Sequence, residues 1–196
     1  MTTVVLATHN PHKVAELQRI LDGLPVELVS GREIDLPDVE ETGDTFAENA
    51  LLKARACTEA TGLPAIADDS GLVVDALGGE PGVRSARYAG RHGDDQANLD
   101  LVLERLDRSP DRSARFVCVA ALTLPGGRQI TEVGVMEGAL TFSPRGDGGF
   151  GYDPIFVAQG EQRTNAELSP DEKDAISHRG AAFRALRPHL AALVER

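Results

Sequence analysis

The sequence has few cysteines, few aromatic residues and no tryptophan. Its 196 residues include two cysteines, Cys57 and Cys118, and only 4% aromatic residues. Both cysteines lie in apolar segments and not at the spacing of metal ligands, so neither a disulfide framework nor a zinc site is indicated. We expect two buried thiols in a reducing compartment. The core must be built from Ala, Val, Leu and Ile, so an aromatic residue in a polar loop is a candidate for a specific role.

Positive charge and long hydrophobic runs are also scarce. The chain has 20 Lys and Arg residues against 31 Asp and Glu, a net charge of -11 and a pI near 4.9. This balance disfavours nonspecific binding to nucleic acid or to an anionic membrane. The first residues, Met1–Leu6, contain neither a basic region nor a long apolar run, so no export signal or membrane span is indicated. We therefore expect a cytoplasmic protein.

Strand-like and helix-like segments alternate along the chain and predict a single α/β domain over residues 1–196. The predicted strands are residues 4–7, 26–29, 115–124 and 129–138, and the predicted helices are residues 10–23, 45–62, 94–106 and 177–194. The last two strands are joined by Pro125-Gly126-Gly127, which favours an antiparallel hairpin and hence a mixed sheet. Pro188 is expected to kink or split the last helix.

Two adjacent acidic residues, Asp68 and Asp69, stand between apolar stretches. In a strand their side chains would point to opposite faces, whereas a turn closed by Gly71 could aim both at one pocket, where Mg2+ accepts oxygen ligands. The second arrangement would begin a metal-assisted phosphate site, and a turn with two solvated acids is the alternative. Glu40 and Glu41 could complete the metal site, although such acids are usually solvated.

The segment Thr8–Lys13 lies where the first strand passes into the first helix. Free backbone N–H groups and the positive end of the helix dipole make such a place suitable for an anion. Lys13 could reach a phosphate while Thr8 and Asn10 donate hydrogen bonds. Ordinary capping by Asn10 with a solvated Lys13 is the alternative. The Walker phosphate loop is excluded because its glycine and lysine spacing is missing.

Two further segments suggest a base-binding site. Residues 148–154 place Phe150 and Tyr152 among glycines, where a ring face could stack on a nucleobase or the aromatics could instead fold back on the core. Residues 177–180 contain His178 and Arg179, with Lys173 shortly before them. These side chains could donate to the acceptor edge of a base, and a surface basic cluster is the competing interpretation.

The order of these segments resembles the inosine/xanthosine triphosphate pyrophosphatase (Ham1-like) family across nearly the whole chain. The matching segments are Thr8–Lys13, Glu40–Ala50, Ala67–Leu72, Pro81–Gly82, Ser85–Tyr88, Gly148–Pro154 and Ser177–Gly180. His9 stands where the family often has glycine. The resemblance implies a long mixed central sheet flanked by helices, two lobes with the active-site cleft between them, and a homodimer. It also implies Mg2+-dependent hydrolysis of nonstandard purine nucleoside triphosphates (ITP, dITP, XTP) to monophosphate and pyrophosphate, which cleanses the nucleotide pool.

The family's site residues are carried over position by position. Asp69 would be the catalytic base, and Glu40, Glu41 and Asp69 would hold Mg2+. The implied substrate-binding residues are Thr8, His9, Asn10, Pro11, His12, Lys13, Lys53, Ser70, Phe150, Gly151, Tyr152, Asp153, Lys173, His178 and Arg179. Lys13, Lys53 and Arg87 would stabilise charge on the leaving pyrophosphate. Asp68 would either assist through the metal's water shell or turn away to hold the loop.

Three other functional classes fit parts of the pattern. A nucleotide-binding module would bind the triphosphate and Mg2+ without releasing pyrophosphate. A phosphoacceptor signalling domain would use the clustered aspartates and a lysine but would need no aromatic platform. A general phosphatase would release orthophosphate.

Overall fold

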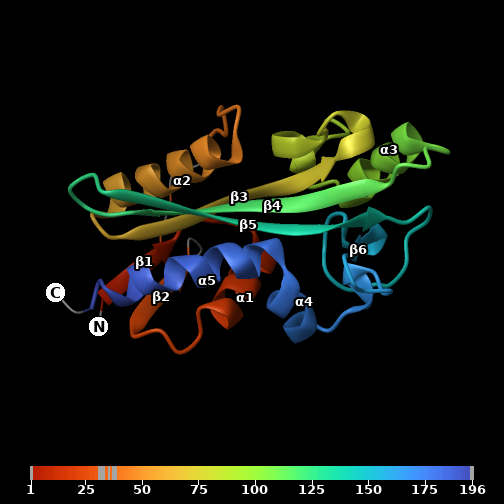
Figure 1. Ribbon diagram of the computed structural model, residues 1–196. Helices are drawn as coiled ribbons and strands as arrows, with labels where there is room; N and C mark the ends of the chain where they lie inside the picture. The colour runs from red at the N-terminus through yellow and green to blue at the C-terminus, as the bar shows by residue number, and fades with distance from the viewer. Residues whose placement is uncertain (1, 31–33, 35, 37–38, 195–196) are drawn as a thin grey trace. The chain divides into compact units, whose positions relative to one another are not determined.

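A computed structural model of the chain describes residues 2–30, 34, 36 and 39–194 (Figure 1). The strands are β1 (Thr2–Leu6), β2 (Val26–Ser30), β3 (Ala65–Val74), β4 (Ser113–Thr123), β5 (Gln129–Leu140) and β6 (Phe156–Ala158). The α-helices are α1 (Pro11–Ile20), α2 (Phe46–Thr61), α3 (Asp95–Leu106), α4 (Pro170–Ile176) and α5 (His178–Ala191). The predicted α/β class is therefore confirmed.

The six strands form one sheet in the order β2-β1-β3-β4-β5-β6. Strand β1 is parallel to both β2 and β3, whereas β5 is antiparallel to β6, so the sheet is mixed as predicted. Between β4 and β5, Gly127 N donates to Leu124 O (3.0 Å) and Leu124 N donates to Arg128 O (2.9 Å), which closes the predicted hairpin.

The chain divides into two compact units, which are described separately. Unit 1 comprises residues 1–69, 118–134 and 179–196, and unit 2 comprises residues 70–117 and 135–178. The cleft that the family resemblance implies between two lobes stays a prediction.

In unit 1 the alternation of side chains along each strand builds two separate cores. Val4 and Leu6 of β1 pack in a cluster with residues of α1 and α5, and Val5 and Ala7 pack in a second cluster with residues of α2. Successive residues of a strand point to opposite faces, so each face of the sheet needs its own cover. Accordingly, α2 covers one face, and α1 and α5 cover the other (Figure 1).

In unit 2 a third core forms between α3 and the sheet. Its buried members include Leu99, Val102 and Leu106, which recur at helical spacing, and Phe116 and Phe156 from strands β4 and β6. The rings of Phe116 and Phe156 lie 4.7 Å apart at an angle of 52°. This core supports the loop that carries Phe150.

Local sequence signals set the start of α1 and both ends of α2, as predicted. The Asn10 side chain accepts from the backbone N–H groups of His12 and Lys13, and Thr45 and Glu48 form a reciprocal capping box. Helix α2 ends at Gly62, whose φ of 68° is the left-handed conformation that favours glycine.

The expected split at Pro188 is wrong, because α5 continues from His178 to Ala191, and the alternative of a kink stays a prediction. Leu186 and Leu190, on either side of the proline, are both fully buried. Packing of this helix against the core therefore outweighs the local preference of proline to end a helix.

Cys57 and Cys118 are both buried free thiols, as predicted. Within the described part of the chain, the helices are too short or too polar to cross a membrane.

Candidate active site

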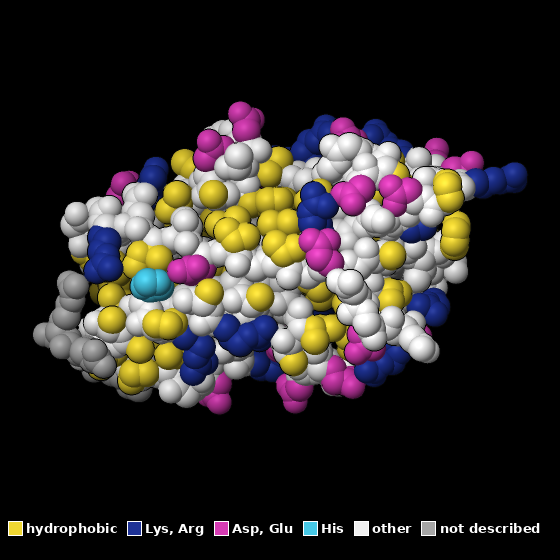
Figure 2. Space-filling model, in the orientation of Figure 1, with side chains coloured by type: hydrophobic (Ala, Val, Ile, Leu, Met, Phe, Trp, Pro, Cys, Tyr) yellow, Lys and Arg dark blue, Asp and Glu magenta, His cyan; other side chains and the backbone are white. Residues whose placement is uncertain are grey.

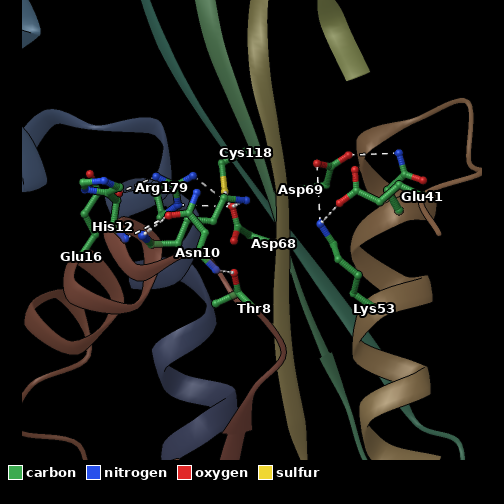
Figure 3. Close-up of polar contacts among 12 residues, drawn as sticks. Thr8, Asn10, His12, Glu16, Glu41, Lys53, Asp68, Asp69, Cys118 and Arg179 are labelled. Atoms are coloured by element: carbon green, nitrogen blue, oxygen red, sulfur yellow. Dashed lines mark hydrogen bonds and ion pairs between the residues drawn. The ribbon is translucent and has the colours of Figure 1, made fainter. Parts of the chain in front are cut away.

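Strand β3 carries the two acidic residues and places them on opposite sides of the sheet. It extends from Ala65 to Val74, so the turn proposed at Gly71 is absent and the expectation that both carboxylates share one pocket is wrong. Asp68 faces the α1 and α5 side and Asp69 faces the α2 side (Figure 3). Both are almost fully buried, with exposed fractions of 2% and 6%.

Asp69 lies in a cluster of alternating charges with residues of unit 1. The Lys53 ammonium is 2.6 Å from Glu41 Oε1 and 3.8 Å from Asp69 Oδ1, and the Asn49 amide donates to Asp69 Oδ2 at 3.1 Å. Burial raises the pKa of Asp69 and outweighs the opposing effect of Lys53, while Glu41 raises it further. Burial alone would lower the pKa of Lys53, but the charges of Asp69, Asp68 and Glu41 raise it instead.

Asp68 belongs to a different network. Its Oδ2 accepts from Lys13 Nζ at 2.9 Å and from Nε and Nη2 of Arg179, both at 3.2 Å. Arg179 also donates through Nη1 to Glu16 at 2.5 Å. Although burial raises the pKa of Asp68, the charges of Lys13 and Arg179 outweigh it and hold the pKa well below its usual range. Asp68 therefore has turned away from Asp69 and holds Lys13 and Arg179.

The start of α1 combines capping with an ion pair. Asn10 caps the helix, and its backbone N–H donates to Thr8 Oγ1 at 3.2 Å. His9, Pro11 and His12 are exposed at this turn. Ordinary capping is thus present, but Lys13 is paired with Asp68 instead of being solvated.

The carboxylates of Asp69 and Glu41 could serve as oxygen ligands of a hard cation that takes only one or two ligands from the protein. Among the described residues no three His, Cys, Asp or Glu side chains are grouped closely enough to hold a metal. Glu41 and Asp69, however, already share one cation, the Lys53 ammonium, whereas Glu40 is exposed. Mg2+ typically takes one or two carboxylates and fills its other positions with water and substrate phosphates, so this pair suits it.

In unit 2, Asp153 organises the loop around Phe150. Asp153 Oδ2 accepts from Lys173 Nζ (2.6 Å) and from Phe150 N (2.9 Å), and Oδ1 accepts from Asn165 Nδ2 (3.2 Å). The Lys173 ammonium also lies 4.8 Å from the centre of the Phe150 ring. A lysine and an aromatic ring from distant segments are thereby fixed beside each other.

The other residues of this loop anchor it to unit 2. Tyr152 is 4% exposed and its hydroxyl donates to Ser85 O at 2.8 Å, so this aromatic does fold back on the core. Burial raises the pKa of its hydroxyl. Gly151 N donates to Asp95 at 2.8 Å.

Three remaining predicted residues differ in their surroundings. His178 is buried and its ring stacks on Phe116 at 4.8 Å and 11°, within unit 2. Arg179 belongs to unit 1, where Asp68 and Glu16 accept from its guanidinium. Ser70 is half-buried in β3.

Sequence reasoning gave no role to three buried polar residues, Asn49, Glu16 and Asn165. Each contacts a predicted site residue: Asn49 contacts Asp69, Glu16 contacts Arg179 and Asn165 contacts Asp153. Asn49 and Glu16 face inward on helices, where a buried polar side chain needs a hydrogen-bond partner. That signal marks them as paired but does not identify the partner.

Comparison of the whole chain with known proteins identifies one family. The model of the Ham1 family matches residues 4–189. The chain is 59% identical to a dITP/XTP pyrophosphatase of Streptomyces coelicolor, with 96% of each chain covered, and 51% identical to one of Geobacter sulfurreducens, with 97% of each covered. The solved structure of a HAM1 protein from Coxiella burnetii has a TM-score of 0.89 at 48% identity, with all of both chains covered.

Proposed function

The chain belongs to the Ham1 family, and we propose on that basis that it hydrolyses the triphosphates of nonstandard purine nucleosides, such as ITP, dITP and XTP, to monophosphate and pyrophosphate. The observation that carries the chemistry is the cluster of Asp69, which is buried, with Lys53 and Glu41, which are half-buried. It combines a carboxylate of raised pKa, a second carboxylate and an ammonium within reach of one another. Removing deaminated purines from the nucleotide pool keeps them out of DNA and RNA.

We assign Mg2+ to Asp69 and Glu41, with Glu40 as the less suitable candidate because it is exposed. When bound, the ion supplies positive charge against the phosphate oxygens. With Asp69 and Glu41 bound to the ion, the Lys53 ammonium would be available to donate to a phosphate oxygen. The requirement for oxygen ligands agrees with the carboxylate pair.

The reaction is a water attack on the α-phosphorus. Asp69 accepts a proton through a carboxylate oxygen while the water oxygen bonds to phosphorus, and the bond to the leaving pyrophosphate breaks. Lys53 from the Asp69 side of β3 and Lys13 from the Asp68 side would both donate to oxygens of the leaving group where β3 continues beyond the end of β1, which stabilises the growing charge. Thr8 and Asn10 support Lys13 by fixing the start of α1.

The purine is assigned to the residues around Phe150. The Phe150 ring stacks on the base, and Lys173 donates to the acceptor at position 6, while His178 contributes to the same polar edge. A donor at this place favours hypoxanthine and xanthine over adenine, whose amino group is itself a donor. Mispaired polar groups in a dry pocket discriminate by roughly ten-thousand-fold or more.

We also propose a homodimer that works in the cytoplasm. Val133 and Val135 of β5 are 58% and 44% exposed. Figure 2 shows hydrophobic side chains clustered on the visible face, over the strands next to α2. A second copy of the chain would cover such apolar surface. The free thiols of Cys57 and Cys118 suit a reducing compartment.

The test is a substrate profile with product identification on the purified protein in the presence of Mg2+. We expect ITP, dITP and XTP to yield pyrophosphate far faster than ATP or GTP does. Orthophosphate as the only inorganic product would instead support a general phosphatase. Binding without turnover would support a nucleotide-binding module, and equal rates on all purines would refute the assigned specificity.

A further inference from the structure

Asn49 is a fully buried amide in the first turn of α2, with an exposed fraction of 0%. Its Nδ2 donates to Asp69 Oδ2 at 3.1 Å and to Gly43 O at 3.3 Å, while its Oδ1 accepts from Gly43 N at 2.8 Å. One side chain thus binds both a carboxylate of β3 and both backbone groups of a loop residue. The capping box that starts α2 fixes the helix turn on which it stands.

The contact with the loop depends on glycine at position 43. A Cβ added to Gly43 would lie 2.8 Å from Asn49 Oδ1 and 2.6 Å from Glu48 Cβ, both too close for a real contact. Only a residue without a side chain lets the backbone approach Asn49 to this distance. Gly43 follows Glu41 by two residues, so the Asn49 amide also fixes the loop segment that carries Glu41.

From these contacts we infer that Asn49 is a positioning residue, which orients Asp69 and holds the Glu41 loop at a fixed place beside it. The inference rests on the proposed function, because it assigns those two carboxylates to the reaction. Asn49 itself touches neither substrate nor metal in this role.

The physical reason lies in the two oxygens of Asp69. Because the Asn49 amide donates a hydrogen bond to Oδ2, rotation of the Asp69 carboxylate is restricted. Oδ1 is thereby kept on the side of Lys53, 3.8 Å from its ammonium. Groups that hold metal-binding or catalytic carboxylates through hydrogen bonds typically contribute 10- to 100-fold in affinity or rate. A displacement of about 1 Å at a reacting group has a comparable effect.

The first test compares Asn49→Ala with Asn98→Ala. Asn98 is a matched control because it is also buried (1%) in a helix and its Oδ1 also accepts from a loop backbone N–H, that of Ala89 at 2.7 Å. With ITP we expect Asn49→Ala to lower kcat by about 10- to 100-fold and to change KM by less than about threefold. Asn98→Ala should keep kcat within about twofold at a similar loss of thermal stability.

A second readout needs no turnover. Binding of Mn2+ to the nucleotide-free protein, followed by electron paramagnetic resonance, should weaken by about tenfold or more in Asn49→Ala and stay unchanged in Asn98→Ala. A purely structural role for Asn49 would not separate the two variants in this measurement.

Asn49→Ser keeps the inference testable if Asn49→Ala does not fold. This variant adds no charge and leaves a hydroxyl group in the site, but its side chain is too short to hold both Asp69 and Gly43 as the amide does. We expect kcat to fall at least about tenfold. Unchanged kcat in the folded Asn49 variants, together with unchanged Mn2+ binding in Asn49→Ala, would overturn the inference. Absence of pyrophosphate release by the wild-type protein would instead overturn the proposed function.

Discussion

Asp68 and Asp69 are neighbours in the sequence but have opposite chemical surroundings. Asp68 faces two cations, Lys13 and Arg179, which keep it ionised, whereas burial raises the pKa of Asp69 despite Lys53. A carboxylate held permanently negative by strong ion pairs is a poor proton acceptor, since the pairs would be lost on protonation. Of these two carboxylates, Asp69 is therefore the better candidate for the base in the proposed reaction.

Substituting Asp69→Asn should abolish most turnover. The change removes both a proton acceptor and a metal-binding charge while keeping the shape, so we expect kcat on ITP to fall at least about 100-fold. Circular dichroism and thermal unfolding should be close to wild type, and the exposed Asp100→Asn on α3 serves as the control. Retention of more than about a tenth of the wild-type rate would contradict the assigned role.

Phe150→Leu should weaken binding of ITP and leave the chemistry intact. Base stacking on an aromatic ring contributes about 1–3 kcal/mol, so we expect KM to rise between about fivefold and 100-fold, with a smaller change in kcat. Phe142→Leu is the matched control, because Phe142 is 71% exposed. Equal effects of the two substitutions in steady-state kinetics would argue against stacking on Phe150.

At the scale of elements, the loop before β6 depends on two glycines for different reasons. Gly149 and Gly151 both have positive φ, 72° and 61°, which strains any other residue. A Cβ at Gly149 would also lie 2.2 Å from Asp153 Oδ2, whereas a Cβ at Gly151 meets nothing within 4 Å. Only the first substitution should disturb the carboxylate that holds Lys173 and Phe150.

Gly149→Ala should therefore raise KM for ITP far more than Gly151→Ala does. Both variants bear the cost of positive φ, roughly 1 kcal/mol, and Gly149→Ala should lose further thermal stability because its Cβ meets Asp153. We expect a KM difference of about tenfold between them in parallel assays, because only Gly149→Ala displaces Asp153. A similar KM for the two would show that Asp153 does not organise the base-binding residues.

Helix α4, which carries Lys173, gives a prediction about pH. Glu172 completes its capping box with Ser169, and hydrogen bonds from Arg163 and the Ser169 backbone lower the pKa of Glu172 to about 2. Because the folded pKa lies below the unfolded value of about 4.3, the stabilisation by this charge is present above pH 4.3 and is lost as the pH falls towards 2.

Glu172→Gln should therefore lower the denaturation midpoint at pH 6 and have no effect near pH 2. Glutamine can still form the capping box, so the difference between the two pH values isolates the charge. Urea denaturation at both pH values measures it, with the exposed Glu104→Gln of α3 as the control. An equal shift at both pH values would mean that the charge contributes nothing.

Elements with local signals were predictable from the sequence, and elements decided by distant partners were not. The start of α2 follows from Thr45 and Glu48, three residues apart. Strand β3 was missed because Asp and Gly favour turns locally. Its two acids are stabilised within a strand by residues 20 to 111 positions away in the chain, among them Asn49 and Arg179.

The same reason separates the predicted site residues into two groups. Lys53, Asp69 and Glu41 do lie together, as do Phe150, Asp153 and Lys173. Arg179, expected at the base, binds Glu16, which lies 163 residues earlier in the chain. No local pattern carries information on a pair of that separation.

At the scale of the whole molecule, an acidic chain that acts on a polyanion must localise its positive charge. The net charge is -11, and the two lysines assigned to the triphosphate are each paired with a carboxylate, Asp68 or Glu41. Such pairing avoids an uncompensated buried charge before the substrate binds. A Mg2+ complex of the nucleotide carries less negative charge and suits an acidic surface better than a free triphosphate.

The most direct measurement of the central claim is hydrolysis of ITP in water enriched in oxygen-18, with mass spectrometry of both products. Attack on the α-phosphorus predicts one labelled oxygen in the nucleoside monophosphate and an unlabelled pyrophosphate. Label in pyrophosphate, or labelled orthophosphate together with the diphosphate, would contradict the account, because water would then have attacked a different phosphorus atom.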